Sequence, residues 1–228
     1  MRKGRARAAL CFGILLLSAC SRGEPTDRLG ETGPKLRLVN RLATKTEDRD
    51  GVRLSSASGN GIAWVEGIRF RTGTIEIDVR GRESMSQSFV GVAFHGTNDT
   101  TYEGVYLRPF NFRAADPARR QHAVQYIAMP SFDFDRLRTD FPEEFENPVA
   151  AALEPTDWVR LRVVVEAGSV RIHVGPGGEA TLQVRKLGQL EDGAVGLWVG
   201  NQSGGDFANL VVTPAAAVPS PHSGMAGK

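Results

Sequence analysis

The chain contains very little cysteine. Among its 228 residues only Cys11 and Cys20 are cysteines, and both lie near the start. Residues 21–228 therefore offer no disulfide, no thiolate ligand for zinc and no thiol nucleophile. A domain in this part of the chain must be stabilised by its hydrophobic core.

Long hydrophobic runs are also absent. The apolar segment Ala8–Leu17 is too short to span a bilayer comfortably. It follows four basic residues and leads into Leu17-Ser-Ala-Cys20, an arrangement that resembles a bacterial lipoprotein signal. The resemblance implies a signal peptide over 1–19, cleavage before Cys20 and lipid on that cysteine. Because Ser21 follows rather than Asp, it also implies export and anchoring to the cell envelope at the outer membrane. A plain secretory signal with an accidental cysteine is the alternative.

A clustered basic face, which nucleic-acid binding needs, is missing as well. The chain has 28 basic and 26 acidic residues, a net charge of +2. Removal of the four basic residues of the signal would change this to about −2. We therefore expect no nucleic-acid partner; the partners expected are a saccharide or glycan and, through Cys20, a membrane.

Composition divides the remainder into three parts. Residues 20–35 are rich in Gly, Pro, Thr and charge, and we expect a lipidated cysteine followed by a flexible tether. Residues 215–228 are rich in Pro, Ala, Ser and Gly, which predicts a disordered tail. One domain is expected over 36–214.

No long helical period occurs in this domain; Pro148–Leu153 offers one or two helical turns at most. Period-2 alternation recurs instead, at 75–79, 90–94, 105–107, 159–165, 170–174, 182–184, 195–199 and 210–212. A further strand is expected over Gln121–Ile127, after a loop at 114–120. Short strands separated by Gly-, Pro- and Asp-containing turns predict an all-β, two-sheet antiparallel jelly-roll sandwich.

Several motifs resemble the concanavalin A-like jelly rolls. These are Gly61-Ile-Ala-Trp64, Gly73-Thr-Ile-Glu76, Asp157-Trp-Val-Arg160 and Gly193-Ala-Val-Gly-Leu197 followed by Gly205-Asp-Phe-Ala-Asn-Leu210. Their order resembles the laminin-G-like modules and the 3-keto-disaccharide hydrolase domains. The resemblance implies two curved sheets, one with an open face that holds the ligand. The indoles of Trp158 and Trp198 are expected to pack in the core or at its edge.

One strand, Gly73–Glu83, also resembles the Glu-x-Asp-x-Glu strand of laminarinase-like glycoside hydrolases, but Arg80 replaces the third acid. Alternation puts Glu76, Asp78 and Arg80 on one face. A guanidinium cannot serve as the acid/base, and retaining hydrolysis needs two carboxyl groups. We expect an ordinary strand with cross-strand ion pairs to residues such as Arg160 or Arg162.

The segment Phe89–Arg138 carries the candidate site. Gly91 and Ala93 are small, so they leave room for a ligand across the sheet, and polar, planar or aromatic groups that suit sugar recognition follow. The expected ligand-binding residues are Asn98, Asp99, Tyr106, Arg108, Asn111, Arg113, Gln125 and Tyr126. Glu103 and His95 are the candidate acid/base pair if the protein is an enzyme. Alternatively, Arg108 and Arg113 brace the loop by ion pairs with Asp116, Asp133 or Asp135.

Three functions remain open at this point. The first is an exported, membrane-anchored glycan-binding lipoprotein. The second is a hydrolase or lyase acting on a glycoside or 3-keto-sugar, and the third is a laminin-G-like protein-interaction module. No metal site or other cofactor is predicted. The laminin-G resemblance leaves calcium open, although Asp133-Phe-Asp135 with Glu143-Glu144 suits a solvated acidic loop.

Overall fold

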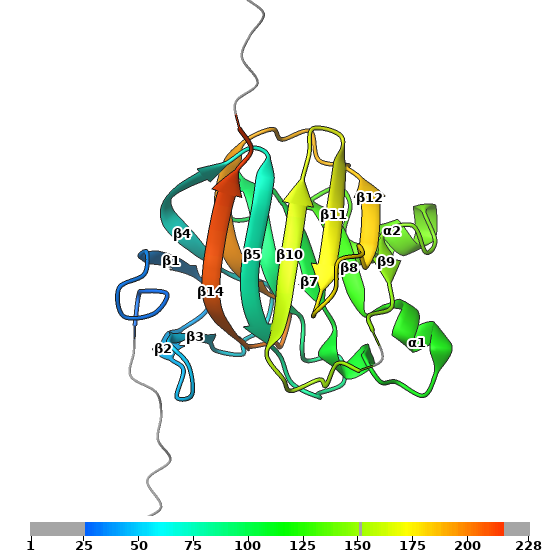
Figure 1. Ribbon diagram of the computed structural model, residues 1–228, viewed down its shortest axis with the longest axis horizontal. Coiled ribbons are helices and arrows are strands. Elements are labelled where there is room, and N and C mark those ends of the chain that lie inside the picture. The colour runs from blue at the N-terminus through cyan, green and yellow to red at the C-terminus, as the bar shows by residue number, and fades with distance from the viewer. Residues whose placement is uncertain (1–25, 151, 217–228) are drawn as a thin grey trace, which may run out of the picture.

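The computed structural model describes residues 26–150 and 152–216, so Cys20 and the segments 1–25 and 217–228 lie outside it. It is a sandwich of two seven-stranded antiparallel sheets, with one sheet in front of the other in Figure 1. This confirms the predicted jelly-roll class. None of the helices described is long and apolar enough to cross a membrane.

We name each sheet after one of its inner strands. The β7 sheet has the order β1 (Leu36–Val39), β4 (Gly61–Phe70), β13 (Gly193–Val199), β6 (Val90–Gly96), β7 (Tyr102–Leu107), β8 (Val124–Met129), β9 (Glu146–Asn147). The β5 sheet has the order β12 (Leu182–Arg185), β11 (Ser169–Val174), β10 (Val159–Val165), β5 (Gly73–Arg80), β14 (Gly205–Pro214), β3 (Gly51–Leu54), β2 (Ala43–Lys45).

The core lies between the sheets and follows the alternation of the strands. On β5, Ile75, Ile77 and Val79 are almost fully buried, whereas the residues between them are partly exposed. β10 pairs with β5 in register, Leu161 opposite Ile77, and turns Val159, Leu161, Val163 and Val165 the same way. Branched apolar side chains at every second position suit a strand with one buried face.

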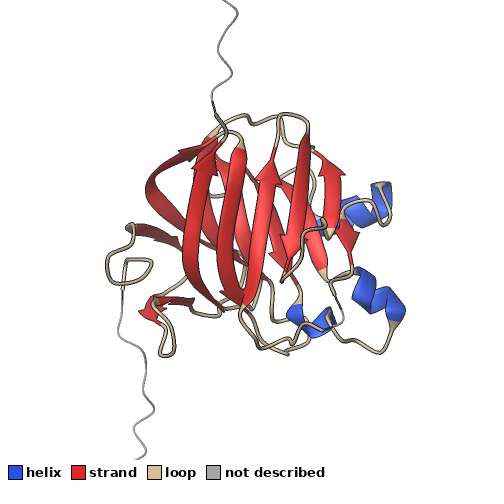
Figure 2. Cartoon of the chain, viewed as in Figure 1, coloured by secondary structure: helices blue, strands red, loops and turns tan. Residues whose placement is uncertain are grey.

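Short helices interrupt the strands along one side of the sandwich, shown in blue in Figure 2. They are the 3₁₀ helix η1 (Pro109–Asn111) and the helices α1 (Pro117–Gln121) and α2 (Phe134–Asp140). The carboxylates of Asp116 and Asp133 accept backbone N–H groups of the first turns of α1 and α2, which is the role of an N-cap.

These helices correct three expectations. The predicted loop 114–120 contains most of α1, and the predicted strand 121–127 starts only at Val124. Asp133 and Asp135 belong to the start of α2 rather than to a solvated loop. Conversely, the described residues of Pro148–Leu153, which follow β9, form no helix.

The end of the expected tether lies against the domain. Residues Arg28 and Lys35 form an isolated β-bridge, and the backbone N–H of Thr26 donates to the carbonyl of Ala43. Leu29 is buried in the core. Residues 26–35 are therefore part of the folded unit.

Candidate functional site

The open face of the β7 sheet, turned away from the core, is covered by aromatic rings. Strand register places Trp198 opposite Gly91 and Ile62, and Gly91 opposite Tyr106. The Tyr106 ring stacks on the Trp198 indole with centroids 4.8 Å apart. The Trp198 Nε1 donates to the Tyr102 hydroxyl over 2.9 Å, and Trp64 meets Tyr102 edge-on.

The small residues of this face make room for those rings. A Cβ on Gly96 would come within 2.2 Å of the Trp64 ring, and one on Gly196 within 2.9 Å of it. A Cβ on Gly91 would come within 2.8 Å of the Tyr106 Cβ. The expectation that Gly91 leaves the sheet free for a ligand is thus wrong, because Tyr106 and Trp198 occupy that space.

Beside this aromatic layer lies a cleft of about 560 Å³, which is within the size range of small-ligand sites. Tyr106, Trp198, Ile127 and Met129 come from the strands and form its floor. Helix α2, helix α1, η1 and the loops around 86 and 201 form its walls. The lining side chains outside the floor include Asn60, Met85, Phe89, Arg108, Phe110, Asn111, Arg119, His122, Asp133, Phe134, Arg138 and Asn201.

Two apolar side chains at the cleft are exposed although they are large. Phe134, the first residue of α2, is 45% exposed and Met85 is 55% exposed. Phe134 also lies beneath two cations, with its ring 5.9 Å from the Arg108 guanidinium carbon and 5.4 Å from that of Arg138. An exposed aromatic ring at the rim of a cleft is available to stack on a ligand.

Arg108 joins the cleft to the sheet beneath it. Its side chain is 4% exposed and donates to the Tyr106 hydroxyl, the Gln125 Oε1 and the His122 carbonyl. Burial lowers the pKa of the Arg108 guanidinium and raises the pKa of the Tyr106 phenol. Gln125, a predicted ligand-binding residue, is fully buried and acts here by holding Arg108.

Glu146, on β9, supplies the negative charge of this region. It is 3% exposed and accepts three hydrogen bonds from Arg138 at 2.9–3.1 Å. His122 Nδ1 lies 2.7 Å from its Oε1, and Arg108 Nη1 lies 3.7 Å from its Oε2. Neither Asp116, Asp133 nor Asp135 forms an ion pair with Arg108 or Arg113 in the part of the chain described; Glu146 and Glu154 do.

The predicted pair Glu103 and His95 forms, but it lies between the sheets. His95 Nδ1 is 2.8 Å from Glu103 Oε1, and each side chain is 1% exposed. The Tyr126 hydroxyl donates to the other carboxylate oxygen, and Lys186 Nζ lies 3.4 Å from Oε1. Burial, with Glu103 alongside, raises the pKa of Tyr126. The four side chains form a polar cluster inside the core, on the opposite side of the β7 sheet from the cleft.

The remaining predicted residues lie apart from the cleft. Asp99 receives hydrogen bonds from Arg37 and from the Trp64 indole, and the Arg37 bond is the main cause that lowers the Asp99 pKa. Asn98 turns back on its own loop, accepting from Thr100. Arg113 is exposed and pairs with Glu154. Of the eight predicted ligand-binding residues, Tyr106, Arg108 and Asn111 line the cleft.

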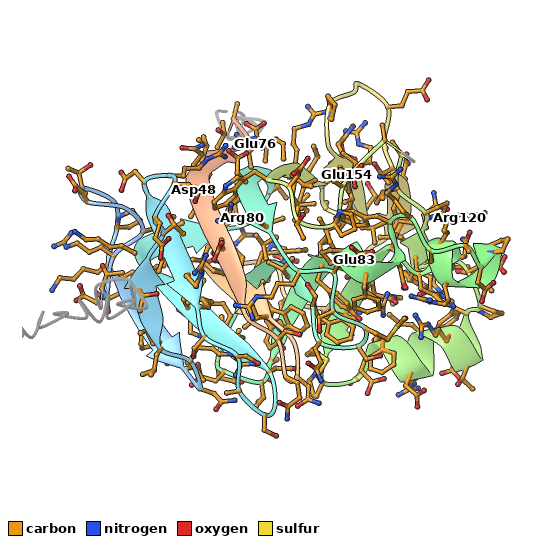
Figure 3. All side chains as sticks on the ribbon, turned by 90° about the horizontal axis from the view of Figure 1, so that it is seen from below. Asp48, Glu76, Arg80, Glu83, Arg120 and Glu154 are labelled. Carbon is orange, nitrogen blue, oxygen red and sulfur yellow. The ribbon has the colours of Figure 1, made fainter. Side chains whose placement is uncertain are left out.

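The strand with the incomplete acid motif belongs to the other sheet. Asp78 accepts from Arg49 and Arg160, and Glu76 lies 3.7 Å from Arg160, as expected for cross-strand pairs. Arg80 donates to Asp48 and Asp206. Figure 3 shows Glu76, Arg80 and Asp48 gathered on one side of the molecule.

Trp158 also belongs to this ion-pair network. Its indole is held between the guanidinium groups of Arg49 and Arg80, with their carbons 4.5 and 4.6 Å from the ring centre. Its Nε1 donates to Asp48. The carboxylates of this face are thus committed to arginines, which favours a structural strand over a glucanase site.

The described residues contain no group of three or more His, Cys, Asp or Glu side chains arranged to hold a metal ion.

No protein-family model matches the chain, and no curated protein matches it. Solved structures do resemble it. The carbohydrate-binding module CBM66 from Bacillus subtilis superimposes with a TM-score of 0.53 at 13% identity, over 77% of this chain and 92% of that one.

Two further structures resemble it to a similar extent. A protein of unknown function with a galectin-like fold, also from Bacillus subtilis, gives a TM-score of 0.51 at 12% identity, over 77% of this chain and 87% of that one. A Bacillus licheniformis β-glucanase gives 0.49 at 12% identity, over 82% and 89%. At these identities the two structures with TM-scores above 0.5 establish the fold alone, which is a jelly roll.

Proposed function

We propose that this domain binds a saccharide in the cleft on the open face of the β7 sheet. The observation that carries the proposal is the cleft itself: about 560 Å³, with the stacked Tyr106 and Trp198 as floor and guanidinium, amide, imidazole and carboxylate groups around it. Saccharides present hydroxyl groups to such polar groups and their C–H faces to aromatic rings. The shared fold of the carbohydrate-binding module supports the proposal.

A binding role suits the site better than a catalytic one. The carboxylate of Glu103 is 1% exposed and faces the core, so a saccharide in the cleft does not meet it. The two carboxylates of the cleft region are engaged: Glu146 by Arg138, and Asp133 as the N-cap of α2. We therefore place the bound saccharide among groups that hold it rather than groups that cleave it.

The test is a change at Phe134, which is exposed and so tolerates truncation. We expect the full chain to bind one or more oligosaccharides from an array, and Phe134→Ala to weaken that binding about tenfold, which corresponds to about 1.4 kcal/mol. Leu42→Ala is the matched control, because Leu42 is 74% exposed and does not line the cleft. Isothermal titration calorimetry measures both. Equal affinities for Phe134→Ala and wild type would place the saccharide elsewhere.

We further propose that the chain is exported and attached to the cell envelope through lipid on Cys20. The sequence Leu17-Ser-Ala-Cys20 after a short apolar segment supports this. In a bacterium with two membranes, labelled palmitate is expected to enter the wild-type protein and the Cys11→Ser variant, while Cys20→Ser stays unlabelled and leaves the membrane fraction. Label in Cys20→Ser would contradict the assignment.

A further inference from the structure

The cleft carries an excess of positive charge. Three guanidinium groups lie at it, those of Arg108, Arg119 and Arg138. Two carboxylates accompany them, those of Asp133, which lines the cleft, and of Glu146, which lies behind Arg138. The guanidinium and carboxylate groups alone leave one net positive charge in a partly enclosed site. Such a site favours an anionic ligand over a neutral one of the same shape.

The three arginines are not equally available. Arg108 and Arg138 share the carboxylate of Glu146, and Arg108 also donates to three protein acceptors. Arg119 has no carboxylate within ion-pair distance among the described residues. Its contacts all come from Nη2, to the Met85 sulfur, the Phe110 carbonyl and the Asn111 side-chain oxygen at 3.2–3.4 Å.

Arg119 is therefore anchored by one end of its guanidinium and open at the other. Its Nε and Nη1 groups make no hydrogen bond within the described chain, although the side chain lines the cleft. Nη1 has two free N–H groups, and each of them suits one oxygen of a carboxylate or of a sulfate ester as a charge-assisted hydrogen bond, whereas the Nε–H group points to the Nη2 side of the guanidinium. The Phe134 ring at the same cleft offers a surface for the sugar that carries such a group.

We propose that the cleft is selective for acidic saccharides, and that Arg119 receives their carboxylate or sulfate group. This inference rests on the proposed function and adds the charge class of its ligand. The shared chemistry is an oxyanion attached to a sugar ring. A uronic-acid residue and a sulfated residue are its two sources.

The experiment is an array of paired glycans probed with the full chain. Each uronate glycan is printed beside its carboxyl-reduced form, and each sulfated glycan beside its desulfated form. The acidic member is expected to bind about tenfold or more tightly, the ratio that one charge-assisted hydrogen bond accounts for. The pair that shows the difference tells whether the group is a carboxylate or a sulfate.

Titrations of the best acidic glycan then test Arg119. Arg119→Gln is expected to remove the preference for the acidic member while the neutral member binds as before. The matched control is Arg120→Gln, one position along α1, which removes one positive charge as well. Arg120 does not line the cleft, and its side chain donates to the carbonyls of Ala114 and Ala115. This control variant should keep the preference. Raising the salt from about 0.05 M to about 0.5 M should weaken only the acidic member.

The outcomes separate the two proposals. If no glycan of either kind binds, saccharide binding itself fails, and this inference fails with it. If neutral members bind as tightly as acidic ones and binding still depends on Phe134, the proposed function stands and the charge selectivity is refuted. Equal losses in Arg119→Gln and Arg120→Gln would refute the role of Arg119, because they would reflect the net charge of the surface alone.

Discussion

The substitution Glu103→Gln distinguishes a structural role of this residue from a role at the ligand. Its carboxylate has three polar neighbours, His95, Tyr126 and Lys186, and all of them are buried; Lys186 is the most accessible at 8%. Glutamine keeps the size of the side chain but removes the negative charge, so Lys186 loses its counter-charge. The amide nitrogen of the new glutamine is a hydrogen-bond donor, and it would face another donor among these three neighbours.

Breaking a buried charge pair by changing one partner costs about 3–5 kcal/mol. Because glutamine still accepts one hydrogen bond, we expect the low end, about 3 kcal/mol. In a domain of this size, each kcal/mol lowers the melting temperature by about 2–4 °C. The expected drop is therefore about 6–12 °C.

Thermal unfolding followed by circular dichroism measures this drop, and calorimetric titration of a bound glycan at 25 °C measures the site. We expect lower stability with the affinity unchanged. Glu83→Gln is the control, because Glu83 is exposed, and it should shift stability by no more than about 0.5 kcal/mol. A Glu103→Gln variant that melts like wild type but no longer binds or processes the saccharide would refute the structural role.

Two further predictions concern pH and packing. The hydrogen bond from Arg80, followed by that from Trp158, lowers the pKa of Asp48 to about 2. Because this pKa is below the unfolded value of about 3.9, the ionised Asp48 stabilises the folded protein fully above about pH 4, and this stabilisation is lost as the pH falls toward 2. The melting temperature of Asp48→Asn should therefore depend less on pH between pH 4 and 2 than that of the wild type. Identical slopes of melting temperature against pH in the two proteins would contradict the ion pair. Gly196→Ala would place a Cβ 2.7 Å from Ile62 and 2.9 Å from Trp64, and should cost about 1–3 kcal/mol in urea unfolding followed by tryptophan fluorescence. Gly178→Ala, with nothing within 4 Å, should cost much less, and equal costs would contradict the close packing of Trp64.

Much of the sandwich could be predicted because the alternation is strong where one face is buried. Ile75, Ile77 and Val79 on β5 follow it, and so do the apolar residues of β10 apart from Val164, which lies at an outward position. The helices α1 and α2 were missed because they are too short to show a helical period. Their signals were local: Asp116 before Pro117, and Asp133 two residues ahead of a second acid.

The site was predicted less well, for two physical reasons. Glu103 lies two and four residues before Val105 and Leu107, so alternation alone places its side chain on their face of the strand, toward the core, where the structure has it. His95 has the parity of Gly91 and Ala93, but a bulge in the pairing of β13 with β6 and a φ of 52° turn its ring inward. Simple alternation does not predict such a bulge.

The other reason is that the cleft is assembled from segments far apart in the sequence. Trp198 lies about 60 residues beyond the predicted segment Phe89–Arg138, whereas Arg119, Phe134 and Arg138 lie within it but reach the cleft on helices α1 and α2, which were not predicted. Trp198 was expected in the core or at its edge, and it is 5% exposed on the open face, at the floor of the cleft. Its position opposite Gly91 was a usable signal: a glycine on one strand makes room for a large ring on the next.

The central claim is that a saccharide occupies the cleft over the β7 sheet. Methyl NMR of the full chain, labelled at isoleucine and methionine, tests it most directly during titration with a bound glycan. The account predicts shifts at Met85, Ile127 and Met129, which line the cleft, and none at Ile75 and Ile172 in the β5 sheet. Shifts at Ile75 or Ile172 with Ile127 and Met129 unchanged would place the ligand elsewhere and contradict it.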